Sequence, residues 1–372
     1  MSIIIFLIVL GVLVVSHEFG HFLVAKLCGM KVEEFGFGFP PRLWGKKIGD
    51  TLYSINWIPF GGFVRIFGED AAGGGSLEVA EPLAEKEAGS FAAAPKWQQF
   101  AVVFAGVVFN FILAWGLVSL GYLIGLPTSV ADATPGQPVQ DAHLIITDIA
   151  PDSPAARVGV AAGDEIVSLS DTGGSLATFS PESVRNFVQA AGKQQLTLGY
   201  KRHSDEVRTV SVTPAEGLVP DRVAIGVAMD SIGVVRLGFF GAIFEGLKTT
   251  WTMTLATVAA LVGLVKGLFV GHAPSGVTGP VGIVGLVGSA SAMGFAYLLT
   301  LVAVISVNLS VMNLIPFPAL DGGRILFIAI ETIRGKEVPP RTAATVNAIG
   351  FFVLLLLMAI LTYGDIAKLV RG

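Results

Sequence analysis

The sequence is poor in charge and in cysteine, and it has no long basic run. Only 14% of its 372 residues are charged while 53% are hydrophobic, and the mean hydropathy is +0.72. This excludes an ordinary soluble domain and predicts several membrane spans. The single cysteine, Cys28, excludes an internal disulfide framework. A net charge of −4 without a basic run indicates no nucleic-acid partner.

The first apolar run, Ile3 to Ala25, has the length of a membrane-spanning helix. No basic segment precedes it, and cleavage of a signal peptide here would remove the polar residues inside it. We therefore predict a retained span over residues 1–26. Its polar residues before the end are Ser16, His17, Glu18 and His21.

Three of these residues form the pattern H-E-x-x-H. On a helix His17 and His21 project from one face, so their imidazoles can hold one zinc ion, and Glu18 can take a proton from a water. Ionisable groups at this depth cost roughly 2.5–3.5 kcal/mol each, which favours a functional role. The alternative is a chance match, or two histidines bonded to neighbouring backbone.

Residues 27–96 differ in kind, because they are rich in glycine and aromatic residues. Strand-like runs at 51–57 and 63–67, joined by a turn at 58–62, predict a hairpin partly sunk against the bilayer. An ordinary amphipathic hairpin on the membrane surface is the alternative. The Gly-, Ala- and Glu-rich residues 71–94 predict a flexible linker.

A second span is predicted at 97–125, with Asn110 its only strongly polar interior residue. Residues 126–230 are predicted to form a polar domain, which begins with a linker at 127–140. It contains a short helix at 181–191. Its strand-like runs are 144–149, 166–169, 195–201, 207–213 and 223–227.

Residues 231–294 include an apolar stretch, 249–270, that Lys266 interrupts. We predict helices on the membrane surface there rather than a span. A third span follows within 295–324. Residues 325–372 contain a loop and a fourth span at about 344–363.

Basic residues predict the orientation. They gather in the loops after the first and third spans, which should therefore face the cytoplasm. Four spans place both basic loops on the cytoplasmic side, whereas a fifth span at 249–270 would place one of them on the opposite side. With four spans the polar domain lies outside. The basic residues are Lys26, Lys31, Arg42, Lys46, Lys47, Arg65 and Lys96, and then Arg324, Arg334, Lys336 and Arg341.

A catalytic zinc site needs at least one further protein ligand. Asp321 is the candidate, and it can reach the histidines only if the third span breaks at Pro316 and Pro318. The alternative for Asp321 is a helix cap outside the membrane. Asn308 and Asn313 have two candidate roles: hydrogen bonds between helices, or contacts to a substrate backbone, which we favour for Asn313.

These residues together resemble a known family. His17 to His21 in a first span, with Asn313-Leu314-Ile315-Pro316-Phe317-Pro318-Ala319-Leu320-Asp321-Gly322-Gly323 near the end of a third, resembles the site-2 proteases. Within them it is most similar to the bacterial regulator-of-sigma-E protease branch. Residues 150–166 resemble part of a PDZ domain. The implied fold is a polytopic α-helical membrane protein with four transmembrane helices, a membrane-associated β-hairpin and an inserted α+β PDZ domain.

The resemblance implies zinc-dependent cleavage of single-span substrates inside the bacterial inner membrane, after an upstream protease has trimmed them. Anti-sigma factors and signal-peptide remnants are the expected substrates. We predict that an unwound substrate pairs with the hairpin near Gly61, Gly62 and Phe63, with Asn313 as a clamp. A PDZ domain outside the membrane would bind a substrate carboxyl terminus or exclude bulky proteins. The rival functions are a metal transporter and a catalytically silent PDZ scaffold.

Overall fold

The computed structural model describes residues 2–69, 87–131, 133, 138–202, 206–219, 222–270 and 278–371. Residues 71–86 of the linker predicted at 71–94 lie outside them. The chain divides into two compact units. The first comprises Met1–Ser119, Ile243–Gly288 and Leu299–Gly372, and the second comprises Leu120–Ala242 and Ser289–Leu298.

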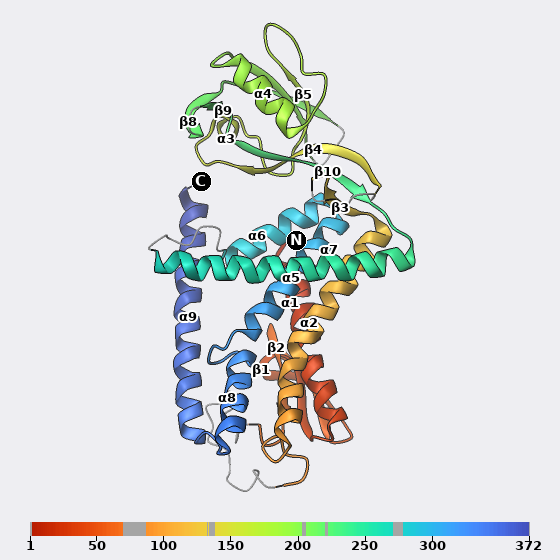
Figure 1. Ribbon diagram of the computed structural model, residues 1–372, viewed down its shortest axis with the longest axis vertical. Coiled ribbons are helices and arrows are strands. Elements are labelled where there is room, and N and C mark those ends of the chain that lie inside the picture. The colour runs from red at the N-terminus through yellow and green to blue at the C-terminus, as the bar shows by residue number, and fades with distance from the viewer. Residues whose placement is uncertain are drawn as a thin grey trace. The chain divides into compact units, whose positions relative to one another are not determined.

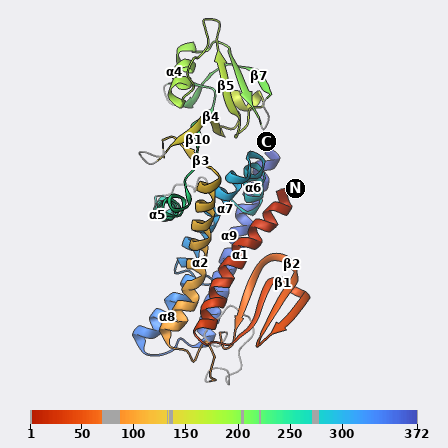
Figure 2. The same ribbon diagram turned by 90° about the vertical axis from the view of Figure 1, so that its right-hand side faces the viewer.

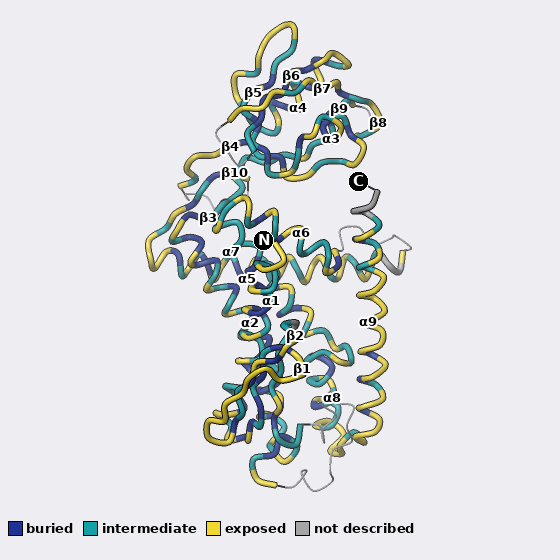
Figure 3. Tube along the Cα trace, turned by 180° about the vertical axis from the view of Figure 1, so that it is seen from behind, coloured by how far each residue is buried: buried dark blue, intermediate teal, exposed yellow. Residues whose placement is uncertain are grey.

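Long apolar helices dominate the first unit (Figure 1). Five of the described helices are long and apolar enough to cross a membrane, and they include the four predicted spans. The helices with residues in this unit are α1 (Ser2–Leu27), α2 (Lys96–Ile124), α5 (Phe239–Phe269), α6 (Pro280–Met293), α7 (Phe295–Leu314), α8 (Asp321–Arg334) and α9 (Pro340–Arg371). Figure 3 shows α9 exposed over most of its length, as expected for a helix surrounded by lipid.

Small residues and hydroxyl groups join the three central helices. A side chain on Gly20 of α1 would lie 2.6 Å from the carbonyl oxygen of Ala105 on α2, so the two backbones approach closely. Ser306 and Ser310 of α7 donate hydrogen bonds of 2.7 and 2.8 Å to backbone carbonyls of α2. Such contacts hold helices together where lipid is as apolar as the side chains.

Two long strands, β1 (Val32–Ile48) and β2 (Thr51–Ile66), form a sheet alongside α1 (Figure 2). Phe35 lies opposite both Val64 and Tyr53, so the two halves of β2 flank the first half of β1. The strands predicted at 51–57 and 63–67 do not pair with each other, because the first half of β1 lies between them. The chain does reverse between Ile55 and Gly62, which both lie opposite Phe37, as the turn predicted at 58–62 requires. Gly61, at φ +99°, lets the chain bend there, and a further turn at 49–50 joins β1 to β2.

Helix α5 runs crosswise to the long axes of α2 and α9 in Figure 1, and Figure 2 views it nearly end-on. Its residues 239–267 are long and apolar enough to span a membrane, but only 6% of its most apolar 18-residue stretch is buried. The indole of Trp115 on α2 donates a hydrogen bond of 2.9 Å to the backbone of Ile243. A crosswise, exposed apolar helix is the arrangement expected at a membrane surface.

The third predicted span breaks where its prolines indicated. Helix α7 ends at Leu314, and α8 begins at Asp321. The prediction for 325–372 missed α8, which continues to Arg334, and α9 begins before the predicted fourth span and ends after it. Helix α8 is amphipathic, with polar residues and an internal Gly-Gly pair. A search of the sequence for long apolar runs therefore does not find it.

The second unit contains a six-stranded sheet in the order β3-β10-β4-β5-β6-β7 and a small β8-β9 pair. Its strands are β3 (Leu126–Ser129), β4 (Val139–Ile149), β5 (Glu165–Ser170), β6 (Leu196–Lys201), β7 (Val207–Val212), β8 (Ala215–Val219), β9 (Arg222–Ala224) and β10 (Val227–Val235). Its helices include α3 (Pro154–Arg157) and α4 (Pro181–Ala191). The apolar core includes Ile146, Leu169, Val184, Leu196 and Leu198, all fully buried.

The predicted boundaries of this unit need three corrections. Residues 127–129 of the predicted linker form part of β3, because they pair with β10. The run predicted at 223–227 is divided between β9 and β10. The unit also extends past 230, since β10 continues to Val235. Helix α4 matches its prediction, with a capping box at Ser180.

One buried ion pair stabilises the second unit. The Asp164 carboxylate is 1% exposed and receives two 2.7 Å hydrogen bonds from Arg202, which also donates to the Gly159 carbonyl. The hydrogen bond to Asp164 raises the pKa of the Arg202 guanidinium, which stays charged.

We expect Arg202→Met to leave Asp164 buried without its partner, and to destabilise this unit by about 3 kcal/mol. Urea unfolding of the full-length protein in detergent, followed by proteolysis within residues 139–235, measures the loss. Lys193→Met is the matched control, because Lys193 forms a pair that is 68% exposed on both sides. Equal unfolding midpoints for the two variants would contradict the prediction.

Candidate metal centre

Three side chains from two distant parts of the chain meet between α1 and α8. His17 Nε2 lies 3.1 Å from Asp321 Oδ2, His21 Nε2 lies 3.5 Å from the same oxygen, and the two Nε2 atoms are 3.3 Å apart. Their side chains are 13 to 17% exposed. The structure thus brings together three of the predicted residues, although Asp321 follows His21 by 300 positions in the sequence.

The geometry of this group fits zinc. A tetrahedral ion with ligand distances of about 2.0–2.1 Å separates its ligand atoms by about 3.3 Å, close to the spacing of these three atoms. Asp321 Oδ2 is buried and has no hydrogen bond of normal geometry to a described residue. Two imidazole nitrogens and a carboxylate oxygen are a common ligand set for catalytic zinc. His17, His21 and Asp321 form the candidate cation site found in the described part of the chain.

Helix α2 orients both imidazoles from behind. His21 Nδ1 is 2.8 Å from the carbonyl oxygen of Val102, and His17 Nδ1 is 3.3 Å from the Asn110 side chain. Between them a side chain on Gly106 would collide with His21 Nε2 and lie 2.6 Å from His17 Cε1. The absence of a side chain at this position is what leaves room for the two rings.

The loop between α7 and α8 places Asp321 at the start of α8, in its first turn. A side chain on Gly322 would collide with the carbonyl oxygen of Ile315, so the chain can reverse this tightly only with glycine. Ala319 adopts a left-handed conformation, φ +73°, and its N–H donates to Asn347 Oδ1 of α9. Helix α9 therefore fixes the loop. The cap that the sequence left open for Asp321 is not observed, because Leu320 is the N-cap.

Further ion pairs attach α8 to its neighbours. Lys96 at the start of α2 contacts Glu331 at 2.7 Å, and Arg324 pairs with Glu69, directly after β2. Arg324 also lies 5.2 Å from the ring centre of the buried Phe91. These contacts anchor both ends of the helix that carries Asp321.

The bent end of β2 borders Glu18. A side chain on Gly62 would lie 3.6 Å from Glu18 Cγ and 3.1 Å from Val14. Gly61 stands at the bend, and the ring of Phe63 covers Gly36. Residues 62–66 pair on one side only within the described sheet, with the first half of β1. Their other edge has unpaired strand positions beside the glutamate.

The two predicted asparagines differ. Asn308 Oδ1 accepts a hydrogen bond of 2.9 Å from Thr257 of α5, which is the interhelical role. Asn313 is half-buried at the penultimate position of α7, and among the described residues its side chain has no hydrogen-bond partner. The amide of Asn313 is thus available for a ligand, and that of Asn308 is engaged.

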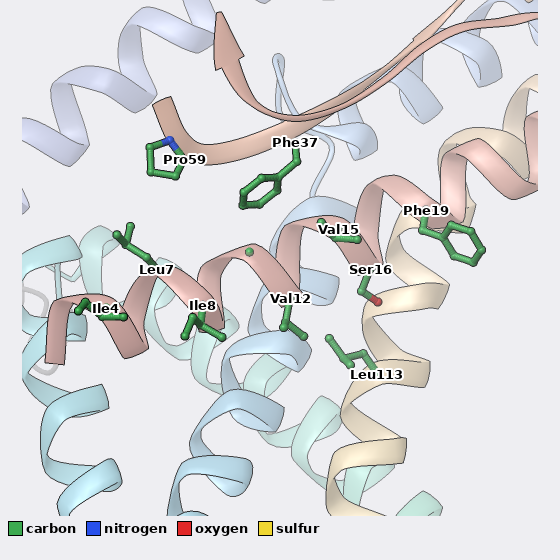
Figure 4. Close-up of a pocket in the computed structure, with 11 residues that line it drawn as sticks. Ile4, Leu7, Ile8, Val12, Val15, Ser16, Phe19, Phe37, Pro59 and Leu113 are labelled. Atoms are coloured by element: carbon green, nitrogen blue, oxygen red, sulfur yellow. The ribbon is translucent and has the colours of Figure 1, made fainter. Parts of the chain in front are cut away.

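A separate apolar groove of about 630 Å³ lies along α1 (Figure 4). It is lined by Ile4, Ile8, Val12, Ser16 and Phe19, with Leu113 of α2 and Phe37 and Pro59 of the sheet among the others. These α1 residues recur every three to four positions and form a stripe that excludes His17 and His21. The groove therefore lies on a different face of α1 from the metal centre.

Sequence reasoning missed the residues that orient the ligands. Asn110 is the only strongly polar residue in the interior of its span, but nothing in the sequence pairs it with His17, because the register between two helices is not encoded locally. The sequence likewise does not indicate that Gly106 and Asn347 support the site. The one available signal was a glycine four residues before a lone intramembrane asparagine, a pattern that fits close contact with another helix.

Comparison with known proteins gives one consistent result. The profile of Peptidase family M50 matches residues 5–357. The chain is similar to zinc metalloprotease RasP of Geobacillus kaustophilus, with 31% identity over 99% of this chain and 98% of the relative. It is 30% identical to zinc metalloprotease RasP of Oceanobacillus iheyensis and 29% identical to the regulator of sigma-W protease RasP of Bacillus subtilis, each over 99% of both chains.

We expect Gly106→Ala to weaken zinc binding by about 10–100-fold, because its methyl group displaces both imidazoles. Competition with a chromogenic chelator on purified protein measures the affinity. Gly116→Ala is the matched control, since no atom lies within 4 Å of the methyl group there, on the same helix. Wild-type zinc affinity in Gly106→Ala would contradict the assigned geometry.

Proposed function

Since the chain belongs to peptidase family M50, the site-2 proteases, and is a zinc metalloprotease, we propose that it cuts the membrane-spanning segment of single-span proteins. The observation that carries this proposal is the meeting of His17 and His21, on a helix apolar enough to cross a membrane, with Asp321 at the start of α8. A site built there is suited to a peptide bond that is itself in the membrane.

His17, His21 and Asp321 would hold the zinc ion. When bound, zinc lowers the pKa of a water to about 7 and polarises the carbonyl of the peptide. Glu18, one position after the first histidine, takes the proton of the attacking water and delivers it to the leaving nitrogen. Low solvent exposure around these residues strengthens their electrostatic interactions.

A substrate helix hides its peptide groups in its own hydrogen bonds, which are costly to break in lipid. The free edge of residues 62–66, next to Glu18, can pair with an unwound substrate and replace those bonds. Asn313 is our candidate for a side-chain clamp. For Asn308 the bond to Thr257 favours the structural role.

The proposed topology has four spans, α1, α2, α7 and α9, in the bacterial cytoplasmic membrane. The crosswise course of α5 supports its position on the membrane surface rather than as a fifth span. Basic residues after α1 and α7 favour the cytoplasmic side for those loops. The second unit, which we propose is a PDZ domain, then lies on the outer side.

The substrates we propose are trimmed membrane anchors. The Bacillus subtilis relative is named a regulator of sigma-W protease, which favours an anti-sigma factor as substrate; signal-peptide remnants are a second class. Prior trimming by an upstream protease fits a PDZ domain that excludes bulky outer domains. Binding of the new carboxyl terminus by that domain is the alternative.

Glu18→Gln separates the protease from its rivals. We expect it to reduce cleavage of a labelled single-span peptide by about 10²–10⁴-fold while zinc affinity changes little, because only the proton acceptor is lost. Wild-type protein with a zinc chelator is the parallel control. A metal transporter or a silent scaffold would give no chelator-sensitive cleavage by the wild type, and unchanged cleavage by Glu18→Gln would contradict the role of Glu18.

Strand addition predicts a difference between the two outer edges of the sheet. Phe63→Asp places a charge at the edge beside Glu18, and we expect kcat/KM to fall by about 10–100-fold through misplacement of the substrate. Trp44→Asp, at a residue 54% exposed on the opposite outer segment, is the matched control. Zinc affinity should stay unchanged in both. Equal cleavage by the two variants would exclude pairing at this edge.

A further inference from the structure

Three positions of α2 form one stripe behind the histidines. Val102, Gly106 and Asn110 are spaced four residues apart, so they lie on one helix face. Each position contacts the histidines differently. The carbonyl of Val102 is an acceptor for His21, Gly106 leaves space for both rings, and the side chain of Asn110 is a polar group next to His17. The two outer positions meet the Nδ1 atoms, and the Nε2 atoms of both rings point to Asp321.

Asn110 is 1% exposed, and its Oδ1 has no hydrogen-bond partner among the described residues. Its Nδ2 lies 3.3 Å from His17 Nδ1. A buried amide oxygen without a partner costs about 1–3 kcal/mol, so it is rarely kept without a reason. Rotation about Cβ–Cγ exchanges the two ends of the amide and brings Oδ1 to His17 Nδ1.

Metal binding explains why such an oxygen is needed. A neutral imidazole that binds zinc through Nε2 carries its proton on Nδ1 and must donate it to an acceptor. Val102 supplies a backbone carbonyl for His21. In the same role for His17, the described structure offers the side chain of Asn110.

We infer that Asn110 is a positioning residue of the metal centre: its amide oxygen accepts the Nδ1 proton of His17 and holds Nε2 toward Asp321. The backbone of Asn110 is fixed by Ser306, whose hydroxyl donates to its carbonyl at 2.7 Å. The inference rests on the metal site of the proposed function. It assigns a partner to His17 that is neither a zinc ligand nor a group in contact with substrate.

The test compares two substitutions of similar size. Asn110→Leu removes the acceptor, and we expect zinc affinity, measured by chelator competition on the purified full-length protein, to fall by about 10–100-fold. Asn110→Asp retains an acceptor and should remain within a few-fold of the wild type. Ser306→Ala is the control for helix contacts, because it removes a bond to the same backbone without touching an imidazole. Wild-type affinity in Asn110→Leu would overturn the inference.

A second measurement can overturn the inference even if Asn110→Leu does not fold. In zinc-loaded wild-type protein labelled with ¹⁵N-histidine, His17 should carry its proton on Nδ1, and this proton should exchange slowly with water. An Nδ1 without a proton, or a proton in fast exchange, would overturn the inference.

His17→Ala separates this inference from the proposed function. Its wild-type zinc affinity would refute the metal site itself, and with it both proposals. Loss of zinc in His17→Ala together with full affinity in Asn110→Leu would refute only the role of Asn110.

Discussion

The close approach of α1 and α2 is the constraint on which the metal centre depends. Gly20 lets the two backbones meet, and Gly106 leaves the space that the imidazoles occupy. With a side chain at either position the helices would separate or the rings would turn. Helix α2 could then no longer direct both Nε2 atoms to Asp321, and three ligand atoms would not lie within 3.5 Å of one another.

Burying ionisable groups in an apolar bundle requires a partner for each of them. His21 is oriented by a backbone carbonyl, His17 by an amide, and Asp321 by its helix and by the loop that α9 fixes. The same requirement applies to the substrate, whose peptide groups need new hydrogen-bond partners when its helix unwinds. A strand edge beside Glu18 provides them without opening the bundle to water.

Much of this arrangement could be predicted from the sequence, because its signals are local. The H-E-x-x-H spacing places two imidazoles on one helix face, and the prolines after Leu314 predicted the break that brings Asp321 back. The course of the sheet could not be predicted. Alternation identifies strands, but the second half of β2 folds back against β1 through a bend at Gly61, and that depends on packing against α1.

The contacts between helices also could not be predicted from the sequence. Asn110 stood out as a polar residue in a span, yet its partner lies 93 positions away, and only the register of α1 on α2 joins them. Helix α8 was missed because its polar face resembles a loop when judged by hydropathy alone. Residues that support a site are harder to predict than its ligands, since backbone and amide groups carry no motif of their own.

Zinc K-edge X-ray absorption on the purified, zinc-loaded protein tests the central claim most directly. The account predicts imidazole scattering from two nitrogens at about 2.0–2.1 Å and further oxygen ligands at about 2.0–2.2 Å, without sulfur. In Asp321→Ala one oxygen ligand should be lost or replaced. A sulfur shell at about 2.3 Å, or a spectrum without imidazole scattering, would contradict the claim that His17, His21 and Asp321 hold the ion.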